Sequence, residues 1–201
     1  MAIQADLIPV LRSAFPARLT SDVDAVLAAM PPSLGYERVS GPQVSIDGEK
    51  IEILSRLYSP EPPDDATRGL SDRQRLILSC LYSRHHDGFV RERNLLGLQG
   101  DEAWVPHFVL QLVGEYVIEI CQAALERVDT ISRASYEAFA AENEEFVALI
   151  RRRVVSYARE YHRSMDFVDY PAYRFMTSLG LWDGPEGRRF IRRSGRSGQL
   201  R

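Results

Sequence analysis

Apolar side chains recur at helical spacing through most of the chain between residues 71 and 179. This spacing gathers them on one face of each helix, and no stretch of similar length alternates with the two-residue period of a strand. A chain of 201 residues suits one domain with a single core. We therefore predict a mainly α fold, a compact helical domain.

One segment before the helical region has a different pattern. Residues 44–53 alternate apolar and polar side chains on both sides of Asp47-Gly48, a pair that favours a type I′ turn. With a two-residue loop, Val44 faces Ile51 across the two strands. Because a lone hairpin is only marginally stable, we expect this small N-terminal β-hairpin to pack on the helices or to gain a third strand.

Proline content and charge divide the chain into four segments. Three prolines and two adjacent aspartates at 59–70 predict a linker without regular structure. Gly, Ser and Arg dominate from residue 184 onward, which predicts a flexible, disordered basic tail. The predicted order is N-terminal helices plus the hairpin at 1–58, packed on the body; the linker at 59–70; a helical body at 71–183; and the tail at 184–201.

Capping signals predict the helices of the body. Ser71 is placed to cap the first of them, and Gly180 to end the last. Asn143, followed by two glutamates, is a candidate internal N-cap. The predicted helices are 4–14 and 20–29 before the hairpin, one from Ser71 to the His85-His86-Asp87 segment, 89–96, about 104–127, about 130–163 with a break allowed at Asn143, and 170–179.

Several classes of protein lack support in this sequence. The N-terminus has no basic segment followed by a long apolar run, and Glu115 and Glu119 interrupt the most apolar stretch, so we predict neither a signal peptide nor a membrane span. Cys80 and Cys121 form no Cys-x-x-Cys pair, and two isolated thiols suit a reducing compartment. We expect a cytoplasmic protein that needs no cofactor, because the common nucleotide-binding and zinc-protease motifs are absent.

Charge is distributed unevenly along the chain. Residues 187–201 contain six arginines and no acidic residue, so this segment carries +6. Since the net charge is −3, everything before it carries −9. Such a tail attracts polyanions and acidic protein surfaces, and we predict weak, salt-sensitive contact with nucleic acid through it.

Two stretches within residues 72–120 resemble a HEAT-type helical repeat. The segment from Asp87 to Leu95 keeps the Asp-x-x-Val-Arg-x-x-x-Leu spacing seen where one repeat turns into its second helix. The segment from Trp104 to Val113 is similar to the proline-started first helix of the next repeat. The resemblance implies a scaffold of paired helices that binds a protein or a nucleic acid on one face; the chain shows no clean longer period, which a solenoid would need.

His85, His86 and Asp87 form the most conspicuous cluster of ligand-type side chains. Two imidazoles and a carboxylate could bind a metal ion or transfer protons. Neighbouring residues on a helix point about 100° apart, which keeps both histidines from facing one ion. We favour a role at the C-terminal end of a helix, where histidines interact with the helix dipole.

A polar stripe runs along the predicted helix at 104–127. His107, Gln111, Glu115 and Glu119 follow one another at spacing four, and Gln122 and Glu126 extend the row. If the stripe lined a pocket, a buried Glu115/Glu119 pair would raise one carboxyl pKa and make His107, Glu115 and Glu119 candidate catalytic residues. We favour the simpler interpretation, a solvent-facing stripe.

A basic, aromatic helix is the third candidate site. Arg151, Arg152, Arg153, Arg159 and Arg163 alternate with tyrosines at a spacing that could grip single-stranded nucleic acid. We favour a solvated face with tyrosines packed inward.

The leading hypothesis is a non-catalytic helical interaction module that binds a protein partner or associates with itself. Two alternatives stay open: a small enzyme that uses the polar stripe, and a nucleic-acid-associated protein that uses the Arg-rich helix and the tail.

Overall fold

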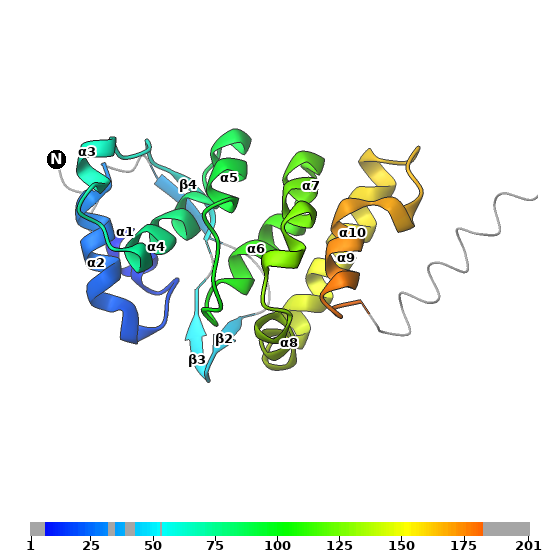
Figure 1. Cartoon of the computed structure of the whole chain (residues 1–201), viewed down its shortest axis with the longest axis horizontal. Coiled ribbons are helices and arrows are strands. Elements are labelled where there is room, and N and C mark those ends of the chain that lie inside the picture. Colours follow the sequence, from blue (N-terminus) through cyan, green and yellow to red (C-terminus); the bar gives the residue numbers. More distant parts are fainter. Residues whose placement is uncertain (1–6, 32–34, 39–42, 53, 183–201) are drawn as a thin grey trace, which may run out of the picture.

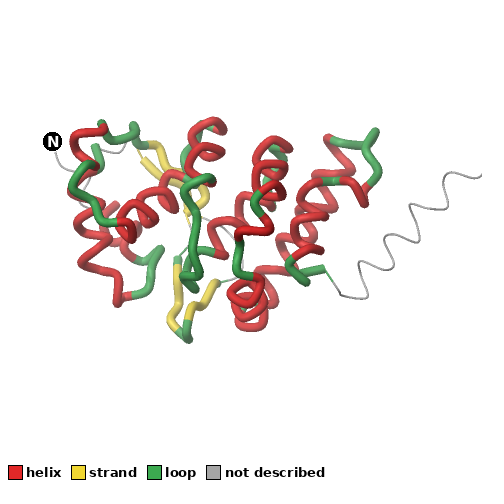
Figure 2. Tube along the Cα trace, viewed as in Figure 1, coloured by secondary structure: helices red, strands yellow, loops and turns green. Residues whose placement is uncertain are grey.

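The computed structural model describes residues 7–31, 35–38, 43–52 and 54–182. Ten α-helices and two small antiparallel sheets make up this part of the chain, and helices dominate it (Figure 2). The predicted mainly α class is therefore confirmed. The predicted basic tail at 184–201 lies outside the described residues. No helix in the described ranges is both long enough and apolar enough to cross a bilayer.

The N-terminal helices pack against the first helix of the body. Helix α1 (Leu7–Arg12) is followed by the 3₁₀ turn η1 (Ala17–Leu19) and helix α2 (Thr20–Ala29). Helix α2 then lies against α4 (Asp72–Tyr82). The predicted cap of α4 is confirmed as a capping box, in which the Ser71 hydroxyl accepts from Gln74 N and the Gln74 side chain accepts from Ser71 N.

The predicted hairpin is confirmed in its strands, turn and register. Strand β2 (Val44–Ile46) pairs with β3 (Glu49–Ile51), and Val44 lies opposite Ile51. Both turn residues, Asp47 and Gly48, have positive φ angles, 55° and 79°. A type I′ turn requires this conformation at both positions.

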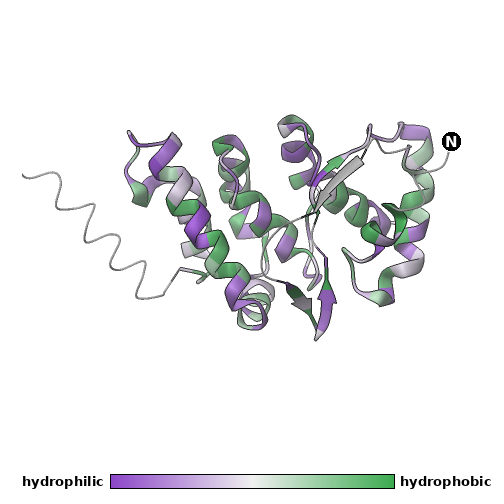
Figure 3. Cartoon of the chain, turned by 180° about the vertical axis from the view of Figure 1, so that it is seen from behind, coloured by the Kyte–Doolittle hydropathy of each residue, from purple (hydrophilic) through white to green (hydrophobic). Residues whose placement is uncertain are grey.

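Polar side chains from both halves of the chain hold the hairpin in place. The side-chain amide of Asn143 makes the two backbone hydrogen bonds that a neighbouring strand would make with Ser45. Its Oδ1 accepts from Ser45 N at 2.7 Å, and its Nδ2 donates to Ser45 O at 2.8 Å. The Glu142 carboxylate accepts from the backbone amides of Asp47 and Gly48 at the turn. On the other side, Glu49 accepts from Ala17 N at 2.7 Å. The outer strand β3 is largely hydrophilic (Figure 3).

A second sheet was not predicted. Strand β1 (Gly35–Arg38) pairs with β4 (Leu54–Tyr58). The segment after α4 extends this sheet, because Leu57 N donates to Arg84 O and His86 N donates to Leu57 O. These pairings join residues 16 to 29 positions apart, which the local pattern of the sequence does not specify.

The expected linker also contains regular structure. Residues 59–70 include the short helix α3 (Asp64–Thr67), which directly follows Pro63. The two aspartates that we took as a sign of irregular chain lie in its first turn, where the helix dipole favours carboxylates. The expectation that 59–70 lacks regular structure is therefore wrong.

The helical body is a row of helices lying side by side (Figure 1). Helix α4 contacts α5, α5 contacts α7, and α7 contacts α10, while α6 lies between α7 and α9. The HEAT-type resemblance concerns α4 to α7 and stays a prediction. The bounds are α5 (Gly88–Leu95), α6 (Pro106–Val113), α7 (Ile118–Glu126), η2 (Val128–Thr130), α8 (Arg133–Glu142), α9 (Glu144–Tyr161), η3 (Phe167–Asp169) and α10 (Pro171–Ser178).

The predicted helix at 104–127 is two helices. Helix α6 ends at Val113 and α7 begins at Ile118. Gly114 caps α6, and Ile150 of α9 lies so close that a Cβ on Gly114 would come within 2.8 Å of Ile150 Cδ1. The break allowed at Asn143 occurs, but the Asn143 side chain binds β2 rather than capping α9.

The close approach at Gly114 yields a prediction with a definite sign. In one continuous helix, Gly114→Ala would raise the free energy of unfolding by about 1 kcal/mol, because alanine is the better helix former. Here we expect Gly114→Ala to lower it by about 1–2 kcal/mol through overpacking. Urea denaturation measures the change.

Ile150→Val supplies the matched background, since it removes the Cδ1 atom that the new methyl group would meet. The cost of Gly114→Ala should be smaller in this background. A stabilising Gly114→Ala in the wild-type background would contradict the close packing of Ile150 against Gly114.

Candidate functional site

The polar stripe does not form one surface in the folded chain. His107 and Gln111 on α6 and Glu115 in the α6–α7 connection are buried, with exposed fractions of 0%, 3% and 7%. Glu119, on α7, is exposed. The solvent-facing interpretation is wrong for the first three residues, because all of α6 is buried and three arginines cover Glu115.

Glu115 lies at the centre of a cluster of three arginines. Its Oε1 atom lies 2.6 Å from Arg84 Nη2 and 2.9 Å from Arg56 Nη1. Its Oε2 atom lies 3.1 Å from Arg91 Nε and 3.3 Å from Arg56 Nη2. We call these four residues the Glu115 cluster. The three arginines lie on different segments of the chain, so no local pattern in the sequence marks them as neighbours of Glu115.

The cluster joins four segments through backbone carbonyls as well as charge. Arg84 Nε and Nη2 donate to Leu54 O and Ser55 O on β4. Arg91 Nη1, from α5, donates to the carbonyls of His85 and His86, both at 2.9 Å. One carboxylate therefore connects four segments: the α6–α7 connection, α5, β4 and the segment after α4.

The arginines keep Glu115 ionised. Burial alone would raise the pKa of its carboxyl group, but the three guanidinium groups together outweigh burial and lower that pKa below its usual value. Glu119 is exposed, so the two carboxylates do not form the buried pair considered from the sequence. An ionised, fully engaged carboxylate is a structural counter-ion rather than a proton donor.

His107 is enclosed in the core beside Phe108 and Phe139. Neither ring nitrogen makes a hydrogen bond of normal geometry, although the backbone carbonyl of Trp104 lies near enough to favour the protonated ring slightly. Burial, reinforced by the positive charge of Arg84, lowers the pKa of His107 to about 3. The imidazole is therefore neutral at physiological pH.

The His85-His86-Asp87 segment does not end a helix, because α4 already stops at Tyr82. His85 Nε2 lies 3.0 Å from Ser59 O, and its Nδ1 accepts from Asp87 N at 3.1 Å. His86 stacks on Tyr58, and the Asp87 carboxylate caps α5 by accepting from Phe89 N. The interpretation as a C-terminal helix cap is wrong, and no cluster of potential metal ligands occurs among the described residues.

Two arginines of the basic segment, Arg151 on α9 and Arg163 just after its end, bind groups within the molecule. Arg151 Nε donates to Leu181 O at 2.7 Å, and Arg163 bonds to Arg159 O and to the Glu160 carboxylate. The expectation that its tyrosines pack inward is wrong for Tyr161, which is 59% exposed and packs against Tyr116 and Tyr157 at the surface.

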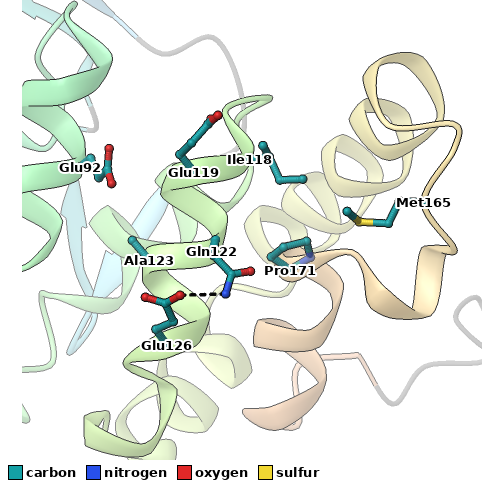
Figure 4. Close-up of a pocket in the computed structure, with 8 residues that line it drawn as sticks. All are labelled: Glu92, Ile118, Glu119, Gln122, Ala123, Glu126, Met165 and Pro171. Carbon is teal, nitrogen blue, oxygen red and sulfur yellow. Dashed lines mark hydrogen bonds between the residues drawn. The ribbon is translucent and has the colours of Figure 1, made fainter.

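A groove of about 400 Å³ lies between α5, α7 and the start of α10 (Figure 4). Its apolar floor consists of Ile118, Ala123, Met165 and Pro171. Glu92 approaches it from α5, and the exposed side of α7 adds the outer half of the predicted stripe, Glu119, Gln122 and Glu126. We call this feature the α7 groove.

The three carboxylates of the α7 groove lack ion-pair partners. Within the described part of the chain, no arginine, lysine or histidine lies within ion-pair distance of Glu92, Glu119 or Glu126. Gln122 Nε2 donates to Glu126 Oε1 at 2.9 Å, which holds one carboxylate beside the floor. Sequence reasoning placed three of these polar residues on one row but missed Glu92, which another helix contributes.

Comparisons with known proteins provide no further assignment: no family model, curated protein or solved structure matches the chain.

The geometry of the Glu115 cluster predicts a large effect of a small change. Glu115→Gln keeps the shape of the side chain but removes the negative charge that three guanidinium groups share. Breaking a buried ion pair by neutralising one partner typically costs about 3–5 kcal/mol, and we expect a loss of this size in the free energy of unfolding. Glu119→Gln is the matched control and should change it by less than about 0.5 kcal/mol.

The same pair of proteins has a defined pH dependence. Because folding lowers the pKa of Glu115, its stabilisation is complete above the unfolded pKa, about 4.3, and is lost as pH falls through the lower folded value. The difference between wild type and Glu115→Gln in urea denaturation should therefore shrink below about pH 4. A difference that is small at pH 7, or unchanged at pH 3, would contradict the cluster.

His107 gives a second pH dependence, in a separate range. Its folded pKa lies below its unfolded value of about 6.5, so the unfolded chain binds more protons and stability falls as pH drops below 6.5, by up to about 1.4 kcal/mol per pH unit. His107→Leu should make the free energy of unfolding depend less on pH between pH 7 and pH 5. The dependence that remains includes that of His85, because burial also lowers the pKa of His85. An unchanged profile in this variant would show that His107 is accessible to solvent.

Proposed function

We propose that this protein is a non-catalytic interaction module that binds a basic, amphipathic segment of a partner protein in the α7 groove. The observation that carries the proposal is the combination of three carboxylates without ion-pair partners and the apolar side chains of Ile118, Pro171 and Met165 beside them. Nine carboxylates of the described chain pair with arginine, and several exposed ones outside the groove, such as Glu144 and Glu145, do not, so what sets the groove apart is the apolar surface beside its carboxylates.

The floor and the carboxylates favour different parts of such a ligand. Met165 is 38% exposed and adjoins Ile118 and Pro171 in the groove, so covering this floor would remove apolar surface from water. The carboxylates of Glu92, Glu119 and Glu126 gather on one side of the apolar floor, which suits a ligand whose arginine or lysine adjoins an apolar side chain. A groove of about 400 Å³ is within the usual size range for binding sites.

The two alternatives have less support in the same geometry. The enzyme alternative depends on His107, Glu115 and Glu119 acting together, whereas the first is sealed in the core and the second is bound to three arginines. The nucleic-acid alternative depends on the Arg-rich helix and the tail, and two of the arginines in and just after α9, Arg151 and Arg163, bind carbonyls or a carboxylate of the protein itself. The acidic α7 groove would repel phosphate.

A labelled peptide tests the proposal directly. The probe is a fluorescein-labelled Arg-Arg-Leu-Leu-Arg-Arg hexapeptide, followed by fluorescence anisotropy as the full-length protein is added at low salt. We expect saturable binding that Glu119→Gln/Glu126→Gln weakens at least about tenfold, because two charge-assisted contacts are lost.

The matched control is Asp64→Asn/Asp65→Asn, which removes the same charge from α3 at the opposite end of the molecule (Figure 1). This variant should bind the peptide with nearly wild-type affinity. Equal weakening by both double variants would indicate attraction to net charge alone, and no binding to any form would reject the proposed function.

A further inference from the structure

The α7 groove has a candidate ligand within its own chain. Residues 188–193 read Arg-Arg-Phe-Ile-Arg-Arg, two apolar side chains between two pairs of arginines. We propose that this segment docks in the α7 groove of the same molecule and competes there with the partner protein. The inference rests on the proposed function of the groove and adds its regulation.

The chemistry of the segment complements that of the groove. Phe190 and Ile191 are the only large apolar residues between residues 184 and 199, and the floor offers them Ile118, Ala123 and Met165. In the docked segment the adjoining arginines would bind the carboxylates of Glu92, Glu119 and Glu126, none of which has an ion-pair partner within the described chain. Arginine suits this contact because its planar guanidinium binds a carboxylate through two parallel hydrogen bonds.

The chain is long enough to make the contact. Pro171, the first residue of α10, lines the groove, and the described chain ends at Trp182, just beyond the other end of that helix. Eight helical residues span about 12 Å. The five residues 183–187 reach about 16 Å when extended, which is enough to return along α10 and bring Arg188 to the groove.

Tethering makes even a weak contact effective. A segment held by a short linker has an effective concentration on the order of 1 mM at a nearby site, so a contact with a Kd of about 100 µM would be about 90% occupied. The competing intramolecular surface is the acidic start of α9, where Glu144 and Glu145 are exposed. Charge alone would direct the segment to either place, but only the groove adds an apolar floor for Phe190 and Ile191.

A spin label can locate the segment in the full-length protein. Cys80 and Cys121 are fully buried, and burial raises the pKa of both thiols, so a maleimide nitroxide should react selectively with Ser194→Cys. Docking should broaden the methyl resonance of Met165, in the groove, and leave that of Met30, which follows α2, unaffected. Salt at 1 M should remove the broadening, since it screens the ion pairs.

Two charge variants decide which acidic surface holds the segment. Glu119→Gln/Glu126→Gln should abolish the broadening of Met165, whereas Glu144→Gln/Glu145→Gln, with the same change of charge, should leave it in place. Two results would overturn the docking proposal. One is that Met165 is not broadened in the spin-labelled Ser194→Cys protein. The other is that Glu144→Gln/Glu145→Gln abolishes the broadening while Glu119→Gln/Glu126→Gln does not.

Competition separates this inference from the proposed function. Replacing Arg188, Arg189, Arg192 and Arg193 by Gln in the full-length chain should tighten binding of the Arg-Arg-Leu-Leu-Arg-Arg peptide about tenfold, because the occupied groove becomes free. Equal affinity of wild type and this variant would reject docking while leaving the groove as a peptide site. Failure of both to bind the peptide would reject the proposed function, and the Met165 signal alone would then decide whether the segment docks.

Discussion

The arrangement of the described chain depends on one buried negative charge. Glu115 binds guanidinium groups from β4, from the segment after α4 and from α5, so it fixes how three segments approach the α6–α7 connection. Such a cluster is costly to bury unless each charge is paired. The cluster therefore specifies one packing of the helices, and that packing places α5 beside α7 and creates the α7 groove.

The break at Gly114 gives the two halves of one polar row different roles. His107, Gln111 and Glu115 become core residues, while Glu119, Gln122 and Glu126 remain at the surface. A continuous helix would have kept all six on one face. The inner half holds the fold together, and the outer half supplies charge to the proposed binding site.

Local chemistry was predictable from the sequence, and long-range pairing was not. The Asp47-Gly48 turn and the Ser71 capping box were predicted because each depends on residues within a few positions of one another. The pairing of β1 with β4 and the arginines around Glu115 escaped prediction, because no local pattern marks Arg56, Arg84 and Arg91 as neighbours. The outer half of the stripe was visible in the sequence, but the floor of the groove needs Met165 and Pro171 from a distant segment.

The central claim is that the outer half of the stripe binds ligands while the inner half is structural. The most direct test maps backbone amide chemical shifts while the Arg-Arg-Leu-Leu-Arg-Arg peptide is added to the full-length protein. The account predicts changes concentrated at Glu92, along α7 and at the start of α10, with the Glu115 cluster unaffected. Changes concentrated on α9, or on Arg56, Arg84 and Glu115, would contradict it.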